Sequence, residues 1–376
     1  MRTPVIIQAK RTAIGKVGGM FRNIPPEKLG AAVLQALVDE NKLDPSQIDE
    51  VILGNAIGPG GNLARLTALT AGFPVDVPAV TVDRQCGAGL EAINIAARLI
   101  QAGAGDIYIA GGVESSSLAP WKLEKPASLY GEPPTLFTRA RFSPDSIGDP
   151  EMGVAAENVA EAYGISREQQ DAFACRSHQK AIASQEEGRF QQEIVPVNGK
   201  TTDECPRPTL TMRSLKRMPP VFQKDGTVTA GNACPINDAA AAVLMMSKEK
   251  CDELGLTPLL QFVDAASAGV DPNLLGIGPI PAVKKLLQRT DLSMEEIDLV
   301  EFNEAFASQV LASVQELNIP EDRLNIGGGA IALGHPYGAS GAILVTRLYT
   351  EMQRTDAKRG MATLGIGGGL GLATLF

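Results

Sequence analysis

A cysteine, a histidine and three glycine-rich or polar segments are the parts of this chain that can carry out chemistry. Cys86 lies in DRQCGAGLEAI, and His335, one of only two histidines, lies in GGGAIALGHPYGASG. The segment NEAFA begins at Asn303, and GIGGGLG begins at Gly365. A thiol nucleophile, an imidazole base and backbone N–H groups that bind an oxyanion are the parts that acyl transfer requires. The residue types therefore predict an acyl-transferring site.

The surroundings of Cys86 and His335 set them apart from ordinary buried residues. A cysteine taken alone is more often an inert core residue. Cys86, however, precedes a helix-like pattern, and the small residues of 87–89 allow a substrate to approach the backbone closely. At the start of a helix, free N–H groups and the helix dipole favour thiolate over thiol. His335 lies between a glycine and a proline in a predicted loop, which favours a reactive imidazole over a core histidine.

The elements that position these residues form an internal repeat. Residues 37–56 (LVDENKLDPSQIDEVILGNA) and 286–305 (LLQRTDLSMEEIDLVEFNEA) share leucine, isoleucine, aspartate, valine and alanine at a constant offset. Each unit predicts a helix, a turn and an apolar strand. Cys86 and the segment 338–341 then precede similar helix and strand patterns. Strands that alternate with helices indicate an α/β protein with mixed or parallel sheets covered by helices.

An insertion at about 118–228 interrupts the first half of this duplicated α/β pattern. It is richer in proline and charge, and it contains a basic run in an otherwise acidic protein: Arg207, Arg213, Lys216, Arg217 and Lys224. Charge runs are usually solvated surface. The functional alternative is a segment that binds phosphate groups.

Composition limits the classes of function. The net charge of −9 argues against broad nucleic-acid binding, although a local basic patch can still bind a small polyanion. No apolar run is long enough to span a membrane, and the N-terminus has no signal-peptide pattern. Five cysteines without a regular spacing fit a reducing compartment, so a cytoplasmic protein is expected. GIGGGLG ends the chain and opens no helix, which excludes a dinucleotide-binding turn.

Nearly every segment of the chain resembles the thiolases. The resemblance rests on blocks in family order, among them AKRTAIGKVGG, DRQCGAGLEAI, AGGVESSS, GTVTAGNA, PINDAAAAV, NEAFA, GGGAIALGHPYGASG and GIGGGLG. It implies a five-layered αβαβα duplication with an inserted loop domain that binds coenzyme A. The implied halves are residues 1–255 and 256–376. The resemblance also implies a homodimer or homotetramer, a coenzyme A thioester as substrate and no tightly bound cofactor or metal.

The resemblance also assigns roles to individual residues. Cys86 matches the nucleophile that takes the acyl group, and His335 matches the base that activates it. Asn303 matches the asparagine that forms one oxyanion hole with a water and the histidine. The backbone N–H groups of Cys86 and Gly367 match the second oxyanion hole. Contact with coenzyme A is implied for four further residues, namely Met152, Arg207, Ser214 and Cys234.

The sequence departs from the thiolase pattern most clearly at Gly365, where thiolases carry a second cysteine that acts as acid and base. Cys234 replaces a serine of the coenzyme A loop, and Glu151 introduces a negative charge beside Met152. Loss of a positioned acid or base costs roughly 10²–10⁴-fold in rate. The expected function is a thiolase-like acyl-CoA C-acyltransferase. The alternatives are an acyl-CoA hydrolase, a decarboxylative condensing enzyme or a catalytically impaired acyl-CoA-binding protein.

Overall fold

The computed structural model describes residues 1–128, 130–137 and 139–376. The strands in these ranges are β1 (Pro4–Thr12), β2 (Gly15–Lys16), β3 (Glu50–Gly54), β4 (Ala79–Val82), β5 (Ile107–Ser115), β6 (Lys122–Glu124), β7 (Thr135–Phe137), β8 (Ile194–Val195), β9 (Asn237–Ser247), β10 (Leu260–Gln261), β11 (Asp264–Gly269), β12 (Leu299–Phe302), β13 (Gly360–Ile366) and β14 (Leu370–Leu375).

The α-helices in the same ranges are α1 (Pro26–Glu40), α2 (Leu63–Thr70), α3 (Ala88–Ala102), α4 (Met152–Tyr163), α5 (Arg167–Glu186), α6 (Met212–Leu215), α7 (Lys248–Glu253), α8 (Pro279–Thr290), α9 (Ala307–Leu317), α10 (Ala330–Leu333) and α11 (Tyr337–Thr355). Short 3₁₀ helices are η1 (Pro45–Gln47), η2 (Pro272–Ile277) and η3 (Met294–Glu296). None of the helices in the described ranges has the length and apolar character needed to cross a membrane.

Two sheets with the same core topology form the body of the molecule. The first has the order β10-β1-β9-β5-β3-β4, with β2 and β8 paired at its margins, and the second has the order β11-β14-β13-β12. In the first sheet β3 pairs in parallel with both β5 and β4, and in the second sheet β12 pairs in parallel with β13. The next pairs, β5 with β9 and β13 with β14, are antiparallel. The two halves therefore repeat one arrangement.

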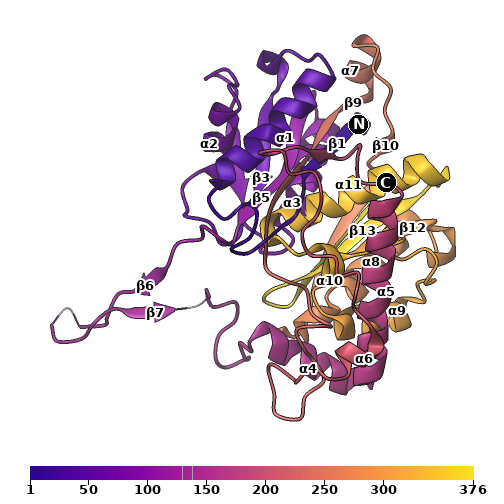
Figure 1. Ribbon diagram of the computed structural model, residues 1–376. Helices are drawn as coiled ribbons and strands as arrows, with labels where there is room; N and C mark the ends of the chain where they lie inside the picture. Colours follow the sequence, from indigo (N-terminus) through magenta and orange to yellow (C-terminus); the bar gives the residue numbers. More distant parts are fainter. Residues whose placement is uncertain (129, 138) are drawn as a thin grey trace.

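Helices separate and cover the two sheets, as Figure 1 shows. Helices α3 and α11 pack against each other and contact both sheets, so they form the central layer. Helices α1 and α2 cover the outer face of the first sheet, while α8 and α9 lie on the outer side of the second. The five-layered α/β duplication predicted from the sequence is confirmed.

The repeated aspartates explain why the two units fold alike. Asp49 accepts hydrogen bonds from the N–H groups of Asp106 and Ile107, at 2.7 and 2.9 Å, where β5 begins. Asp298 accepts hydrogen bonds from the N–H groups at 358 and 359, at 2.8 and 3.0 Å, where β13 begins. In both halves one carboxylate therefore fixes the start of the strand that leads into the site.

The long excursion between β5 and β9 corresponds to the insertion. It begins with the hairpin of β6 and β7, which extends away from the body of the molecule (Figure 1). Helices α4 and α5 then pack against α9 and α10 of the second half, and β8 pairs with β1. Strand β10, which follows residue 255, pairs with β1 of the first sheet.

A buried ionic network joins the insertion to both halves. Glu193 of the insertion accepts hydrogen bonds from Arg11 of β1 and from Arg347 of α11, both at 2.7 Å. Asp203 accepts two further bonds from Arg11, and the Phe190 ring lies against both guanidinium groups. Buried charges are tolerated only when they are paired in this way. The network therefore fixes where the insertion sits.

Candidate active site

Cys86 lies on a tight turn between β4 and α3. Gln85 has a φ of 48°, in the left-handed region that residues other than glycine seldom adopt, and its N–H donates to the carboxylate of Asp83 at 2.8 Å. The turn ends when the N–H of Gly87 donates to the carbonyl of Arg84 at 3.0 Å. This geometry places the thiol just before the first turn of α3, as the sequence predicts.

The sequence-based expectation that the helix would favour the Cys86 thiolate is wrong. Burial raises the pKa of the Cys86 thiol to about 11, and the charges of Glu114 and Asp83 raise it as well. Hydrogen bonds from the N–H groups of Gly367 and of Cys86 itself oppose the shift only in part. Desolvation therefore outweighs the helix end. The resting nucleophile is a thiol that needs a base during attack.

Gly367 meets Cys86 from the opposite half of the fold. Its N–H lowers the pKa of the Cys86 thiol, and the neighbouring Ile366 packs against Gly87. A Cβ at Gly367 would lie 2.9 Å from the Phe142 ring, closer than carbon atoms approach, so the ring covers this turn. The structure therefore brings together the two backbone donors that the sequence places far apart.

His335 is buried and held on both sides. Its exposed fraction is 2%, and its backbone N–H donates to the Asn237 side chain at 2.9 Å. The ring Nδ1 lies 2.6 Å from the Ser340 hydroxyl, and Nε2 lies 3.4 Å from the Asn303 amide nitrogen. An Asn303 donor at Nε2 assigns the ring proton to Nδ1. Burial lowers the pKa of His335 to about 4, so the imidazole is neutral and can accept a proton.

Asn303 follows the last residue of β12, and its neighbour Glu304 fixes the segment. The N–H of Asn303 donates to Thr363 of β13 at 3.0 Å. Glu304 accepts hydrogen bonds from Ser177 at 2.6 Å and from Asn325 at 2.7 Å. Because these partners engage its carboxylate, Glu304 positions the NEAFA segment, while the Asn303 amide is left to face His335.

The turns before α3 and α11 meet in the central layer. A Cβ at Gly89 would lie 2.6 Å from the carbonyl oxygen of Gly338, so only glycine permits this approach. Glu114 of β5 accepts a hydrogen bond from the Gly338 N–H at 3.0 Å and so ties the α11 turn to the first sheet. Burial raises the pKa of Tyr337, two residues after His335. The nucleophile and the imidazole loop thus face one site.

The place opposite Gly365 is occupied by Gln309 of α9. A Cβ at Gly365 would lie 2.5 Å from the Gln309 amide nitrogen and 3.1 Å from the carbonyl oxygen of Gly276. Gln309 has an exposed fraction of 2%. The space that the missing cysteine would use is therefore filled by a carboxamide, which is neither an acid nor a base at neutral pH.

Of the four predicted coenzyme A residues, Cys234 lies beside the NEAFA motif, where its N–H donates to the carbonyl of Ala305 at 3.0 Å. Burial raises the pKa of the Cys234 thiol. Arg207 is exposed and donates its backbone N–H to His178 at 3.1 Å, whereas Ser214 caps α6 through Thr211. Met152 begins α4. Within the described residues no hydrogen bond joins Met152, Arg207 and Ser214 to one another.

The charge introduced by Glu151 has a partner that the sequence did not indicate. Arg139 forms ion pairs with Asp149 at 3.0 Å and with Glu151 at 3.4 Å. The negative charge at the start of α4 is thus partly offset before any anionic ligand arrives.

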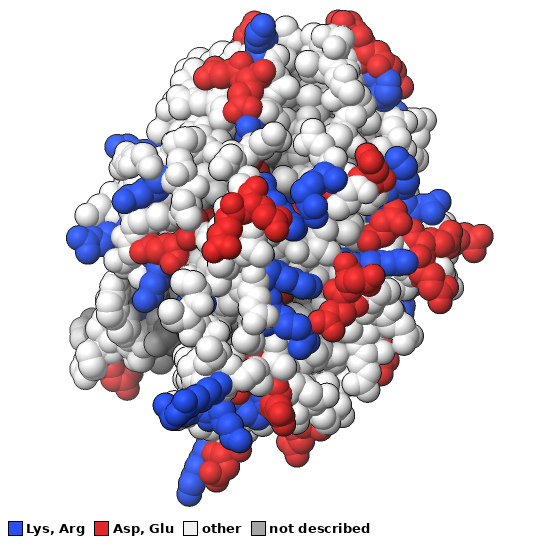
Figure 2. Space-filling view, turned by 45° about the vertical axis from the view of Figure 1, so that its right-hand side comes forward, with Lys and Arg blue, Asp and Glu red and all other residues white. Residues whose placement is uncertain are grey.

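The basic run is exposed and unpaired. All five residues of the run (Arg207, Arg213, Lys216, Arg217 and Lys224) are exposed, and none forms an ion pair within the described part of the chain. Figure 2 shows Lys and Arg side chains gathered at the lower end of the molecule, the end that carries α6 in Figure 1. Cations without partners are free to meet a ligand's phosphates.

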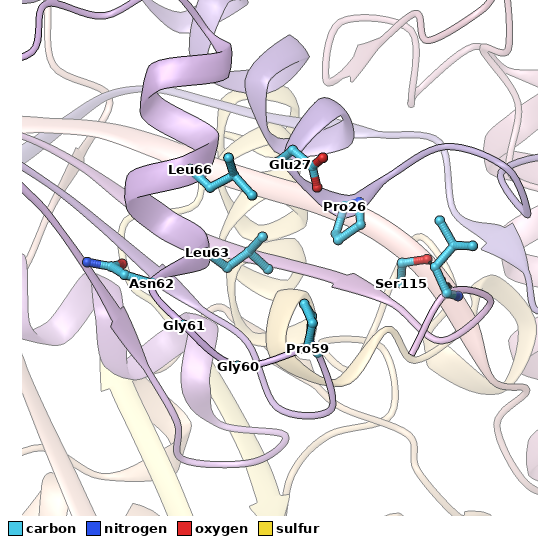
Figure 3. Close-up of a pocket in the computed structure, with 11 residues that line it drawn as sticks. Pro26, Glu27, Pro59, Gly60, Gly61, Asn62, Leu63, Leu66 and Ser115 are labelled. Atoms are coloured by element: carbon cyan, nitrogen blue, oxygen red, sulfur yellow. Dashed lines mark hydrogen bonds between the residues drawn. The ribbon is translucent and has the colours of Figure 1, made fainter. Parts of the chain in front are cut away.

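A separate surface pocket of about 220 Å³ lies away from the thiol. Figure 3 shows that the start of α1, the loop before α2 and the end of β5 enclose it, with Leu63, Leu66 and Pro59 among its walls. None of its lining residues belongs to the Cys86, Asn303 or His335 segments. It is therefore not the site assembled above.

The residues that sequence reasoning missed all support predicted ones. Ser340 holds the His335 ring, Glu114 ties the α11 turn, and Gln309 fills the space at Gly365. Each lies within or beside one of the motifs AGGVESSS, NEAFA and GGGAIALGHPYGASG. The motifs indicate which segments contribute to the site, but they do not show which group each residue contacts.

A duplicated α/β fold with a thiol, an imidazole and paired backbone donors at its centre defines an acyl-transferring enzyme class. The thiolase N-terminal domain model matches residues 4–249, and the thiolase C-terminal domain model matches residues 256–376. The chain belongs to the thiolase family, and it is an acyltransferase of the thiolase type.

Curated relatives and solved structures match over the full chain. "Putative acetyl-CoA C-acetyltransferase VraB" of Staphylococcus epidermidis is 50% identical over 100% of this chain and 98% of its own length. The Bacillus anthracis acetyl-CoA acetyltransferase has a TM-score of 0.94 at 39% identity, and human mitochondrial 3-ketoacyl-CoA thiolase has 0.94 at 36%; each comparison covers 100% of this chain and 98% of the other. These similarities do not favour the hydrolase, decarboxylating or binding-protein alternatives.

Proposed function

We propose that this protein transfers an acyl group from a coenzyme A thioester to Cys86 and then to or from a second coenzyme A substrate. The observation that carries the proposal is the approach of the 366–367 turn to the Cys86 turn, where Ile366 lies against Gly87 and the Gly367 N–H lowers the pKa of the Cys86 thiol, together with the Asn303–His335 pair. A donor that reaches the sulfur also lies within reach of an oxygen on a carbon bonded to that sulfur. This is the geometry that an oxyanion requires.

His335 takes the proton from Cys86 as the sulfur attacks the thioester carbon. With pKa values near 11 for the thiol and 4 for the imidazole, a resting ion pair is disfavoured. Proton transfer and attack therefore proceed together. The Cys86 and Gly367 N–H groups form one oxyanion hole, and Asn303 with His335 forms a second. Each hole stabilises the oxyanion of one of the two steps, which are acyl transfer to Cys86 and transfer to or from the second substrate. Collapse expels the coenzyme A thiolate and leaves an acyl-cysteine.

The test is direct acylation of the native enzyme. Incubation with acetyl-CoA should add one acetyl group to the protein by intact mass, and peptide mapping should place it on Cys86. Cys86→Ser should remain unmodified. Cys251→Ser, a change at a buried thiol of α7 that donates to the Leu256 carbonyl, should behave as wild type. A wild-type protein that stays unmodified over hours would refute the nucleophile assignment.

The insertion is proposed to bind coenzyme A through Arg207, Ser214 and Met152, with Cys234 at the end nearest the thiol. The exposed, unpaired cations of the basic run support this role, because phosphates are bound by charge-assisted hydrogen bonds. Coenzyme A enters and leaves as a substrate, and no tightly bound cofactor is proposed.

A homodimer or homotetramer is proposed for the functional state. Strand β4 ends the first sheet, where its free edge offers backbone groups to a second strand. The hairpin of β6 and β7 exposes large apolar side chains, with Trp121 at 84% and Tyr130 at 90%. Exposed apolar groups on a projecting arm fit a contact between copies of the chain. Size-exclusion chromatography with light scattering measures the mass of the particle in solution and so gives the number of subunits.

A cytoplasmic location is proposed on the state of the cysteines. All five are free, and Cys86, Cys205 and Cys234 are only partly buried. Free thiols of this kind persist in a reducing compartment.

A further inference from the structure

Cys234 is a second thiol held between the two motifs that flank the site. Its backbone N–H donates to the carbonyl of Ala305 at 3.0 Å. Two residues later, Ile236 pairs with His335 in a parallel bridge. The segment that carries Cys234 therefore runs from the NEAFA motif to the imidazole loop, across the site assembled around Cys86.

Cys234 and Cys86 are both partly buried, and they come from different elements. Ala233 forms a bridge with Phe306 and Ile236 forms one with His335, so both flanks of Cys234 are fixed against the Asn303 and His335 segments. Burial raises the pKa of the Cys234 thiol. These backbone contacts bring Cys234 to the site that holds Cys86.

The Cys234 proton is not committed to another group. The Cys251 thiol donates a hydrogen bond to a carbonyl at 3.1 Å, but in the described ranges no carbonyl or carboxylate accepts one from the Cys234 thiol. Burial keeps this thiol protonated. It therefore holds a proton that a substrate atom can take.

The other acidic groups around the site are engaged. Glu114 accepts hydrogen bonds from the Asn55 amide at 2.7 Å and from the Gly338 N–H at 3.0 Å. Glu304 is bound by Ser177 and Asn325. The place opposite Gly365 holds an amide. Cys234 and the Tyr337 phenol remain. Burial raises the pKa of both groups, and Cys234 is preferred because its segment contacts both the NEAFA motif and the imidazole loop.

We propose that Cys234 is the proton donor and acceptor in the step that makes or breaks the carbon–carbon bond. It takes the role for which residue 365, a glycine in this chain, has no thiol. This rests on the proposed acyl transfer to Cys86. In thiolysis, Cys86 sulfur bonds the keto carbon of a 3-ketoacyl-CoA, and the bond to the α-carbon breaks. Cys234 gives its proton to that carbon, which releases an acyl-CoA. The Cys234 thiolate then takes the proton of incoming coenzyme A, whose sulfur accepts the acyl group and frees Cys86.

The experiment separates the two steps with four variants of the full-length protein. Cys234→Ala removes the proton donor, Cys234→Ser keeps a small polar group of much higher pKa, and Tyr337→Phe removes the competing phenol. Cys251→Ser is the matched control at a thiol outside the site. Acetylation of Cys86 by acetyl-CoA and thiolysis of acetoacetyl-CoA are measured separately for each. Acetylation expels a thiolate, a good leaving group that needs no proton, whereas thiolysis expels carbon.

We expect Cys234→Ala and Cys234→Ser to lose roughly 10²–10⁴-fold in kcat for thiolysis. At saturating acetyl-CoA, where weaker coenzyme A binding no longer limits the reaction, the rate of Cys86 acetylation should fall far less. A folding defect would lower both rates together. Near-native thiolysis in Cys234→Ala, or the loss appearing in Tyr337→Phe instead, overturns the proposal. If wild type is not acetylated at all, the proposed function itself fails, which is a different result.

A second measurement tests the proximity of the thiols without relying on activity. Dibromobimane becomes fluorescent when it links two neighbouring thiols. Wild type should give one linked peptide pair containing Cys86 and Cys234, and either Cys86→Ser or Cys234→Ser should abolish it, while Cys251→Ser keeps it. Absence of that pair from wild type would show that the two sulfurs do not share the site.

Discussion

A thiol restored at residue 365 has to compete with Gln309 for space. The backbone itself tolerates a side chain, because Gly365 lies in β13 and is absent from the glycines with positive φ. The obstacle is the carboxamide, which lies 2.5 Å from a Cβ at this position. Gly365→Cys alone therefore inserts a side chain into an occupied volume.

The cost follows from the overlap. Non-bonded heavy atoms prefer separations of about 3.5–4.0 Å, so the Gln309 amide nitrogen has to move by roughly 1 Å. Overpacking of this kind costs about 1–3 kcal/mol in a buried environment. The Gly276 carbonyl oxygen at 3.1 Å limits the opposite direction. We expect Gly365→Cys to lower the free energy of unfolding by that amount, and Gly365→Cys with Gln309→Ala to lower it less than Gln309→Ala alone.

The assay uses Cys234→Ala as the starting protein, because it lacks the proposed proton donor. Gly365→Cys in this background should recover little thiolysis, since the sulfur is displaced. Adding Gln309→Ala opens the space and should raise thiolysis at least ten-fold, with little effect on acetylation of Cys86. Gly365→Ser with Gln309→Ala is the control that has the same shape without a thiol. Thermal unfolding of every variant reports the packing cost.

Two outcomes refute this reasoning. If Gly365→Cys alone keeps the wild-type melting temperature and restores thiolysis, Gln309 is no obstacle. If the serine control restores thiolysis as well as the cysteine does, the gain comes from the cavity and not from an acidic thiol.

Two further predictions concern the insertion. The double variant Lys216→Ala with Arg217→Ala should bind coenzyme A about 2- to 30-fold more weakly at low salt and with a flatter salt dependence, since each exposed ion pair contributes about 0.2–1 kcal/mol. Calorimetry measures the affinity, with the double variant Lys28→Ala and Lys200→Ala as the control. If the two double variants bind coenzyme A equally well, the basic run is only a solvated surface. Arg347→Met should lower the free energy of unfolding by about 3–5 kcal/mol, because it leaves buried carboxylates without their cation. Arg354→Met, at a partly exposed ion pair, should lower it by under about 1 kcal/mol. Equal losses in thermal or urea unfolding would contradict the role of the network.

The repeat made the fold predictable from the sequence alone. Asp49 and Asp298 recur at one offset because each caps the N–H groups of the strand that leads into the site. The constant offset between the repeated residues therefore predicted both the duplication and the positions of its strands. The turns that hold Cys86 and His335 could be predicted because neighbouring glycine and proline residues mark a turn.

The missing parts depend on distances that no sequence spacing records. Gln309 follows the NEAFA motif, but its contact with Gly365 depends on how α9 packs against β13. The pKa of Cys86 was expected to fall because the helix start is visible in the sequence, whereas burial by the opposite half is not. Likewise, Cys234 could be linked to coenzyme A by motif, but its neighbour Cys86 became apparent only in three dimensions.

The network around Glu193 also sets an order of events during synthesis. Arg11 and Glu193 leave the ribosome long before Arg347, so the nascent first half holds a carboxylate that still lacks one of its two cations. The region around Glu193 reaches its full stability only after α11 has been translated and has packed against the first half. Chains cut at the seam between the halves would keep this incomplete state permanently. The pairs at Glu193 consequently link the stability of the two halves of this duplicated fold, even though each repeats the same architecture.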